Sequence, residues 1–135
     1  MALVEWTQKL SVGIPSIDKQ HQKLIELLNA FFVSVQNKDG KGKIATVIKG
    51  LKDYTIEHFN SEEAVMRIHK YPGLEVQVRE HESFVKTVQD FEDRFNKGKL
   101  ILTLEITNFI RDWITNHIMN VDKQYSDFLA QRGVK

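Results

Sequence analysis

Residues 42–69 read GKIATVIKGLKDYTIEHFNSEEAVMRIH, and their pattern decides the fold. Apolar or small residues return every three or four positions, which is the spacing of one face of an α-helix. The members of this stripe are Ile44, Ile48, Leu51 and Thr55. His58 and Glu62 continue the same face and lie one turn apart. The stretch therefore predicts one long helix with ionisable side chains on the face that it buries.

The residues that interrupt helices gather at four places, which are Gly13 with Pro15, 39–42, 71–73 and 97–99. They divide the chain into an N-terminal arm and four segments with apolar stripes. We expect the arm over 1–17 and helices near 18–37, 42–69, 74–96 and 101–131. Short connections between long helices favour antiparallel neighbours. The sequence thus predicts an all-α fold, an antiparallel up-down-up-down four-helix bundle with the arm packed on one side.

Length and composition limit what such a bundle can be. The 135 residues are 41% hydrophobic, which suits a single domain over 1–135. The chain has no Cys, which excludes disulfides and thiolate metal sites. With 19 Lys and Arg against 18 Asp and Glu, no block of charge indicates a nucleic-acid partner. No apolar run approaches the roughly 20 residues that span a bilayer. We expect a cytoplasmic monomer that does not insert into membranes.

Each predicted helix places one histidine on its apolar face. Two carboxylates lie close to these histidines in the sequence, Glu62 one turn after His58 and Asp122 just beyond His117. The six residues are His21, His58, Glu62, His81, His117 and Asp122. Counted outward from the turns, the residues on neighbouring helices differ in height by only about 1.5 to 3 Å. The four helices are therefore expected to deliver these side chains to one layer of the core.

A metal centre explains the six residues together. A single inward histidine is more often a hydrogen-bonded core residue, but buried carboxylates beside several imidazoles need a compensating cation. Four imidazoles with two carboxylates suit two first-row ions bridged by the carboxylates. The chain contains neither Glu-x-x-His, typical of carboxylate-rich di-iron proteins, nor His-Glu-x-x-His of zinc proteases. His69 would lie about 16 Å along the axis from His58, so it is given no role.

Asp122 does not fit this pattern in a regular helix. It follows His117 by five residues, a step that rotates about 140° and leaves the stripe. A one-residue π-bulge near Met119 to Val121 would return Asp122 to the buried face, and π-bulges are frequent at functional sites. The sequence therefore predicts such a bulge.

The combined spacing resembles the hemerythrin family. The similar features are His21, His58-x-x-x-Glu62, His81, His117-x-x-x-x-Asp122, Trp6, Ser11-Val12-Gly13-Ile14 and Ile17-Asp18-x-Gln20-His21. The resemblance covers essentially the whole chain. It implies two iron ions (Fe2+/Fe3+) with an oxo or hydroxo bridge, and bridging by Glu62 and Asp122. It also implies that His21 and His58 hold the iron at which O2 binds.

The function implied is reversible O2 binding for storage, delivery or sensing. The chain would then not be an enzyme, and an O2-consuming enzyme would be a recipient of its O2. Four residues beside the expected ligands are candidate walls of an O2 pocket, although helix packing explains them equally well. They are Phe59, Trp113, Ile114 and Ile118.

One position departs from the family pattern. The third helix normally carries His-x-x-x-His, but here Gln77 stands four residues before His81. Gln77 could ligate through its amide oxygen, could leave the position to a water molecule, or could be inert. An altered second iron opens an alternative function, di-iron redox catalysis such as peroxide reduction or nitric oxide chemistry. A metal-free helical interaction module is the third hypothesis.

Overall fold

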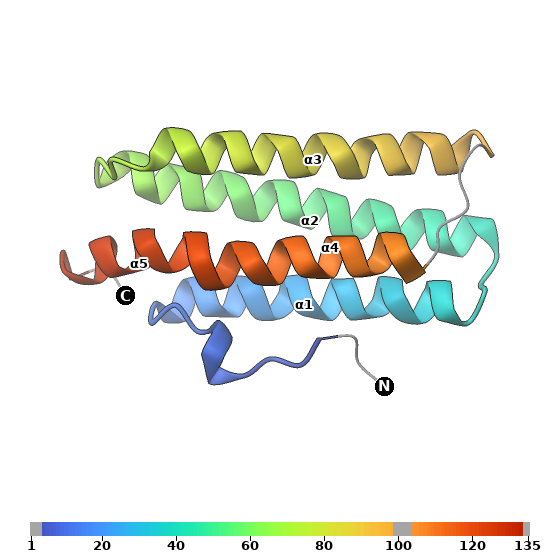
Figure 1. Ribbon diagram of the computed structural model, residues 1–135, viewed down its shortest axis with the longest axis horizontal. Coiled ribbons are helices and arrows are strands. Elements are labelled where there is room, and N and C mark those ends of the chain that lie inside the picture. The colour runs from blue at the N-terminus through green and yellow to red at the C-terminus, as the bar shows by residue number, and fades with distance from the viewer. Residues whose placement is uncertain (1–3, 99–103, 134–135) are drawn as a thin grey trace.

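The computed structural model describes residues 4–98 and 104–133, and it consists of long helices laid side by side (Figure 1). A short 3-10 turn, η1 (Gln8–Leu10), is followed by α1 (Pro15–Gln36), α2 (Lys41–Ile68), α3 (Leu74–Asn96), α4 (Leu104–Asn116), the π-helical η2 (His117–Asp122) and α5 (Lys123–Ala130). The described part of the chain contains no strand. Because α4, η2 and α5 follow one another without a gap, they form the fourth long helix of the bundle. The four long helices alternate in direction, as predicted.

The helix boundaries agree with the sequence except at the start of α1. This helix begins at Pro15, three residues earlier than expected. Proline suits the first position of a helix, where its missing N–H is not needed and its φ angle is already helical. Pro15 therefore starts a helix and does not merely end the arm. The expected start of the fourth helix at residue 101 lies outside the described residues, as do residues 1–3 of the arm.

The apolar stripes of the helices meet in one core. Its fully buried members include Leu28, Phe31, Ile48, Leu51, Met66, Ile110 and Leu129. Thr55 is buried in the same stripe, and its hydroxyl is satisfied there because it donates to the Leu51 carbonyl at 2.6 Å. The predicted amphipathic pattern of α2 is confirmed.

The N-terminal arm packs along the bundle through specific contacts. Asp18 of α1 accepts hydrogen bonds from the Ser11 hydroxyl at 2.6 Å and from the Val12 amide at 2.8 Å. Asn29 exchanges two hydrogen bonds with the Val4 backbone, at 3.0 and 2.8 Å. These bonds hold the arm beside α1, where Figure 1 shows it.

The π-helical turn η2 confirms the predicted bulge. It spans His117–Asp122 and joins α4 to α5 without a break in direction. The wider turn returns Asp122 to the core, where it is 0% exposed. No helix among the described residues is both long enough and apolar enough to cross a membrane.

Candidate metal centre

The six residues singled out in the sequence lie together in the middle of the bundle. Each is buried, with at most 4% of its surface exposed. They form two overlapping groups, and within each group the ligand atoms all lie within 4.8 Å of one another. One group is His21, His58, Glu62 and Asp122; the other is Glu62, His81, His117 and Asp122. Both groups contain the same two carboxylates.

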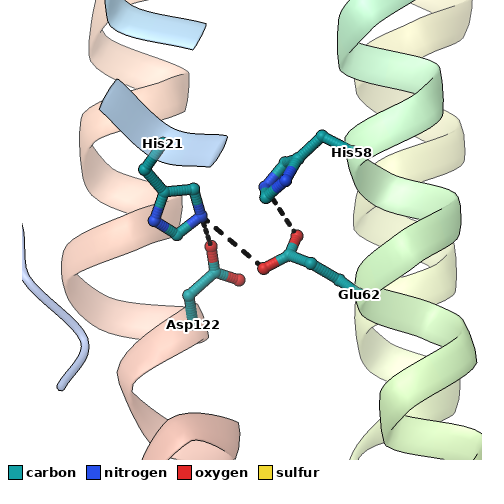
Figure 2. Close-up of side chains that lie close together, drawn as sticks. All are labelled: His21, His58, Glu62 and Asp122. Atoms are coloured by element: carbon teal, nitrogen blue, oxygen red, sulfur yellow. Dashed lines mark ion pairs between the residues drawn. The ribbon is translucent and has the colours of Figure 1, made fainter. Parts of the chain in front are cut away.

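The first group joins α1, α2 and η2 (Figure 2). His21 Nε2 lies 3.2 Å from Asp122 Oδ2 and 3.6 Å from Glu62 Oε2. His58 Nε2 lies 3.1 Å from Glu62 Oε1. Figure 2 shows these four side chains pointing toward one another across the core.

The second group joins α2, α3 and η2. His117 Nε2 lies 3.1 Å from Asp122 Oδ1 and 3.1 Å from His81 Nε2. His81 Nε2 lies 3.6 Å from Glu62 Oε1. Asp122 thus presents one carboxylate oxygen to each group, which is the arrangement of a carboxylate that bridges two ions.

Several of these atoms approach one another without forming hydrogen bonds. Both ring nitrogens of His21, together with Glu62 Oε1 and Asp122 Oδ2, have no hydrogen-bond partner among residues 4–98 and 104–133. Buried polar atoms are normally paired, so such a concentration requires an explanation. Ligands about 2.1 Å from one ion and at right angles stand about 3 Å apart. The spacings here match that geometry, and the donor set of imidazoles and carboxylates suits first-row metal ions. The residues fit a metal pair.

Three of the four histidines are oriented by an acceptor behind the ring. His58 Nδ1 lies 2.7 Å from Gln20 Oε1, His81 Nδ1 lies 2.8 Å from Glu63 Oε2, and His117 Nδ1 lies 3.1 Å from Glu80 Oε1. Such partners place the proton on Nδ1 and leave the lone pair of Nε2 for a metal. His21 lacks a partner of this kind among the described residues.

Glu63, Glu80 and Tyr125 were not identified from the sequence. The Tyr125 hydroxyl donates a short hydrogen bond to Glu62 Oε2, and the tyrosine is fully buried. Burial and the charge of Glu62 raise the pKa of Tyr125 well above its ordinary value. Adjacency in the sequence does not reveal these roles, because Glu63, which follows Glu62, meets His81, and Glu80, which precedes His81, meets His117.

The charges of the site favour a cation in its centre. Burial lowers the pKa of His21, but contacts with Asp122 and Glu62 outweigh it and raise the pKa to about 9. Burial raises the pKa of Glu62, but His58 and His21 hold it well below its ordinary value. In the metal-free protein at neutral pH, a protonated His21 therefore balances the carboxylates, and a metal ion would compete with that proton.

Gln77 lies beside the second group and is 1% exposed. Its Nε2 donates to Asp122 Oδ1 at 3.2 Å and stands 3.4 Å from the Val121 carbonyl. Its Oε1 is buried and has no hydrogen-bond partner in the described part of the chain. The amide therefore meets the shared carboxylate with its nitrogen.

Aromatic and aliphatic side chains enclose the imidazoles. Phe59 stacks on His81 with ring centroids 3.7 Å apart, and Trp113 stacks on His117 at 4.6 Å. Ile114 and Ile118 are each 1% exposed. Phe59, Ile114 and Ile118 therefore lie in the buried core, whereas Trp113 is half-buried and lines a surface cavity of about 240 Å³ beside His117. His69 belongs to neither ligand group.

Comparisons with known proteins agree with this geometry. The family model "Hemerythrin HHE cation binding domain" matches residues 12–129. Bacteriohemerythrin of Stenotrophomonas maltophilia is 37% identical over 127 residues, covering 94% of this chain and 82% of the relative. Bacteriohemerythrin of Methylococcus capsulatus is 30% identical over 131 residues, covering 96% and 99%. The crystal structure of a wild-type hemerythrin superposes with a TM-score of 0.89 at 29% identity, covering 93% of this chain and 97% of that one. The chain belongs to the hemerythrin family.

Proposed function

We propose that this chain is a single-domain O2-binding protein that holds two iron ions (Fe2+/Fe3+) with an oxo or hydroxo bridge. The ligands are His21, His58, Glu62, His81, His117 and Asp122. The observation that carries the proposal is the pair of overlapping ligand groups that share Glu62 and Asp122. The family is known for reversible O2 binding at a di-iron site. The role is storage, delivery or sensing of O2, with an O2-consuming enzyme as recipient.

The proposed ligands and the residues behind them have different roles. Iron supplies the electrons that reversible O2 binding requires. Glu62 and Asp122 offset the positive charge of two ions, and Gln20, Glu63 and Glu80 orient three of the imidazoles.

Tyr125 holds Glu62 Oε2 through its hydroxyl proton. The walls that we propose for the O2 pocket exclude water and admit a small apolar gas; they are Phe59, Trp113, Ile114 and Ile118.

The test is anaerobic reconstitution with Fe(II), followed by metal counting and absorption spectra through repeated cycles of O2 and argon. We expect two irons per chain and a visible band that appears and disappears reversibly. His58→Gln should lose one iron and the band. His69→Gln is the matched control, because it removes a histidine outside both ligand groups, and it should behave as the wild type. A wild-type chain without stoichiometric iron would contradict the proposal and favour a metal-free interaction module.

Redox catalysis is a second candidate, favoured by one observation. The second group contains only two imidazoles, and Gln77 turns its amide nitrogen toward Asp122. A less saturated iron would react more readily with peroxide. The measurement is peroxide consumption by the iron-loaded chain with ascorbate as reductant. Sustained turnover would favour the catalytic function, whereas a stable band that releases intact O2 would favour the carrier.

A further inference from the structure

The two ligand groups present similar atoms to the centre. Each consists of two imidazoles and the two shared carboxylates, so the number of imidazoles does not distinguish them. Glu62 Oε2 accepts a hydrogen bond from the Tyr125 hydroxyl. Asp122 Oδ1 likewise accepts one from Gln77 Nε2. The clearest difference between the two groups lies behind the imidazoles.

Carboxylates stand behind both imidazoles of the second group. Glu63 Oε2 lies 2.8 Å from His81 Nδ1, and Glu80 Oε1 lies 3.1 Å from His117 Nδ1. Neither glutamate pairs with a Lys or Arg in the described part of the chain. A carboxylate that accepts the Nδ1 proton makes the imidazole a stronger donor at Nε2. The two negative charges also attract a cation on the other side of the rings.

The imidazoles of the first group lack such carboxylates. The acceptor behind His58 is the neutral amide of Gln20, whose Oε1 lies 2.7 Å from Nδ1. Nδ1 of His21 is buried and has no hydrogen-bond partner among the described residues. The first group thus depends on Glu62 and Asp122 for its negative charge, whereas the second group has two carboxylates in addition to these.

Ring stacking distinguishes the groups in the same direction. Phe59 lies parallel to His81, with an interplanar angle of 1° and centroids 3.7 Å apart. Trp113 covers His117 at 11° and 4.6 Å. The two imidazoles of the first group instead meet each other edge-on, at 73° and 4.7 Å. Ligands whose rotamers are locked by packing lose less freedom when a metal binds. The second group is therefore better preorganised.

We propose that the second group is the high-affinity metal position, that it fills before the first group, and that Glu63 and Glu80 set this order as positioning residues. This inference rests on the proposed two-ion centre and deepens it. The family resemblance implies that O2 binds at the ion between His21 and His58, which belong to the first group. A chain with one iron would then hold its metal away from that place, and O2 binding would depend on the supply of a second iron.

The test follows the four imidazoles while the metal-free full chain is titrated with Zn(II). Histidine labelled with ¹⁵N reports on each ring separately, because the Nε2 signal shifts when that nitrogen binds a metal. At one zinc per chain, we expect the metal shift at both imidazoles of the second group and at neither imidazole of the first. The first zinc should bind at least about 10-fold more tightly than the second.

A double variant, Glu63→Gln with Glu80→Gln, removes both charges but keeps an acceptor behind each ring. The gap between the two zinc affinities should narrow by about 10-fold or more. Glu57→Gln with Glu75→Gln is the matched control, because it removes the same charge from exposed positions of the same two helices. This control should keep the wild-type order and the wild-type gap.

A reciprocal change tests the first group. Gln20→Glu, added to the double variant, places a carboxylate behind His58 and should make the first group fill first. The inference is overturned if wild type shows the metal shift in both groups together or in the first group first. An unchanged gap in the double variant would overturn it too.

Metal counting separates these outcomes from a failure of the two-ion centre. A chain that takes up a single zinc, at the second group, would refute the two-ion centre and uphold the preference for that group. A single zinc at the first group, or no zinc, would refute both.

Discussion

Tyr125→Phe removes a single buried hydroxyl and should destabilise the metal-free protein measurably. The hydroxyl donates to Glu62 Oε2, and both side chains are 0% exposed. Glu62 is ionised because its pKa is held well below the ordinary value. A hydrogen bond to a buried charged group contributes about 1.5–3 kcal/mol, and the oxygen left behind has no water to replace it. We therefore expect the free energy of unfolding to fall by about 2 kcal/mol, a decrease of roughly 6–10 °C in Tm for a chain of this length.

Urea unfolding of the metal-free protein, followed by circular dichroism, measures the effect. Tyr54→Phe is the matched control because Tyr54 is half-buried on α2, outside both ligand groups. Its unfolding free energy should change by no more than about 0.5 kcal/mol. Equal stability of Tyr125→Phe and Tyr54→Phe would refute the reasoning, since it would mean that Glu62 does not depend on the tyrosine.

Three further predictions concern other parts of the site. Glu63→Leu removes the acceptor behind His81 and should weaken metal binding about 10- to 100-fold in a competitive chelator titration; Glu75→Leu, at an exposed position of α3, should leave the affinity unchanged. Ile114→Ala should lower the free energy of unfolding by about 2–5 kcal/mol and speed autoxidation of the iron-loaded chain; an autoxidation rate equal to wild type would count against water exclusion by this side chain. Because His21 has a pKa of about 9 in the folded metal-free protein against 6.5 when unfolded, its stabilising contribution, about 3 kcal/mol, is complete below pH 6.5 and is lost as the pH rises through 9. Urea unfolding across this range should show that loss in wild type, and His21→Gln should not show it.

Periodicity predicted the helices because it is a local property. The stripe of α2 and the breaker residues between helices depend only on neighbours in the chain, and the structure agrees with both. The π-helical turn was predictable for the same reason, since a five-residue step cannot stay on one face of a regular helix. The start of α1 at Pro15 was placed too late because proline was considered only as a breaker.

The sequence by itself determined the architecture, the six candidate ligands and the family, because spacing along each helix and the lengths of the turns decide which side chains share a face and a level. Only the tertiary structure decided which groups stand behind those ligands. The acceptors Glu63 and Glu80 and the donor Tyr125 depend on how neighbouring helices are rotated about their axes. The direction of the Gln77 amide depends on the two oxygens of another helix that it meets. These are contacts between segments far apart in the chain, and no local pattern encodes them.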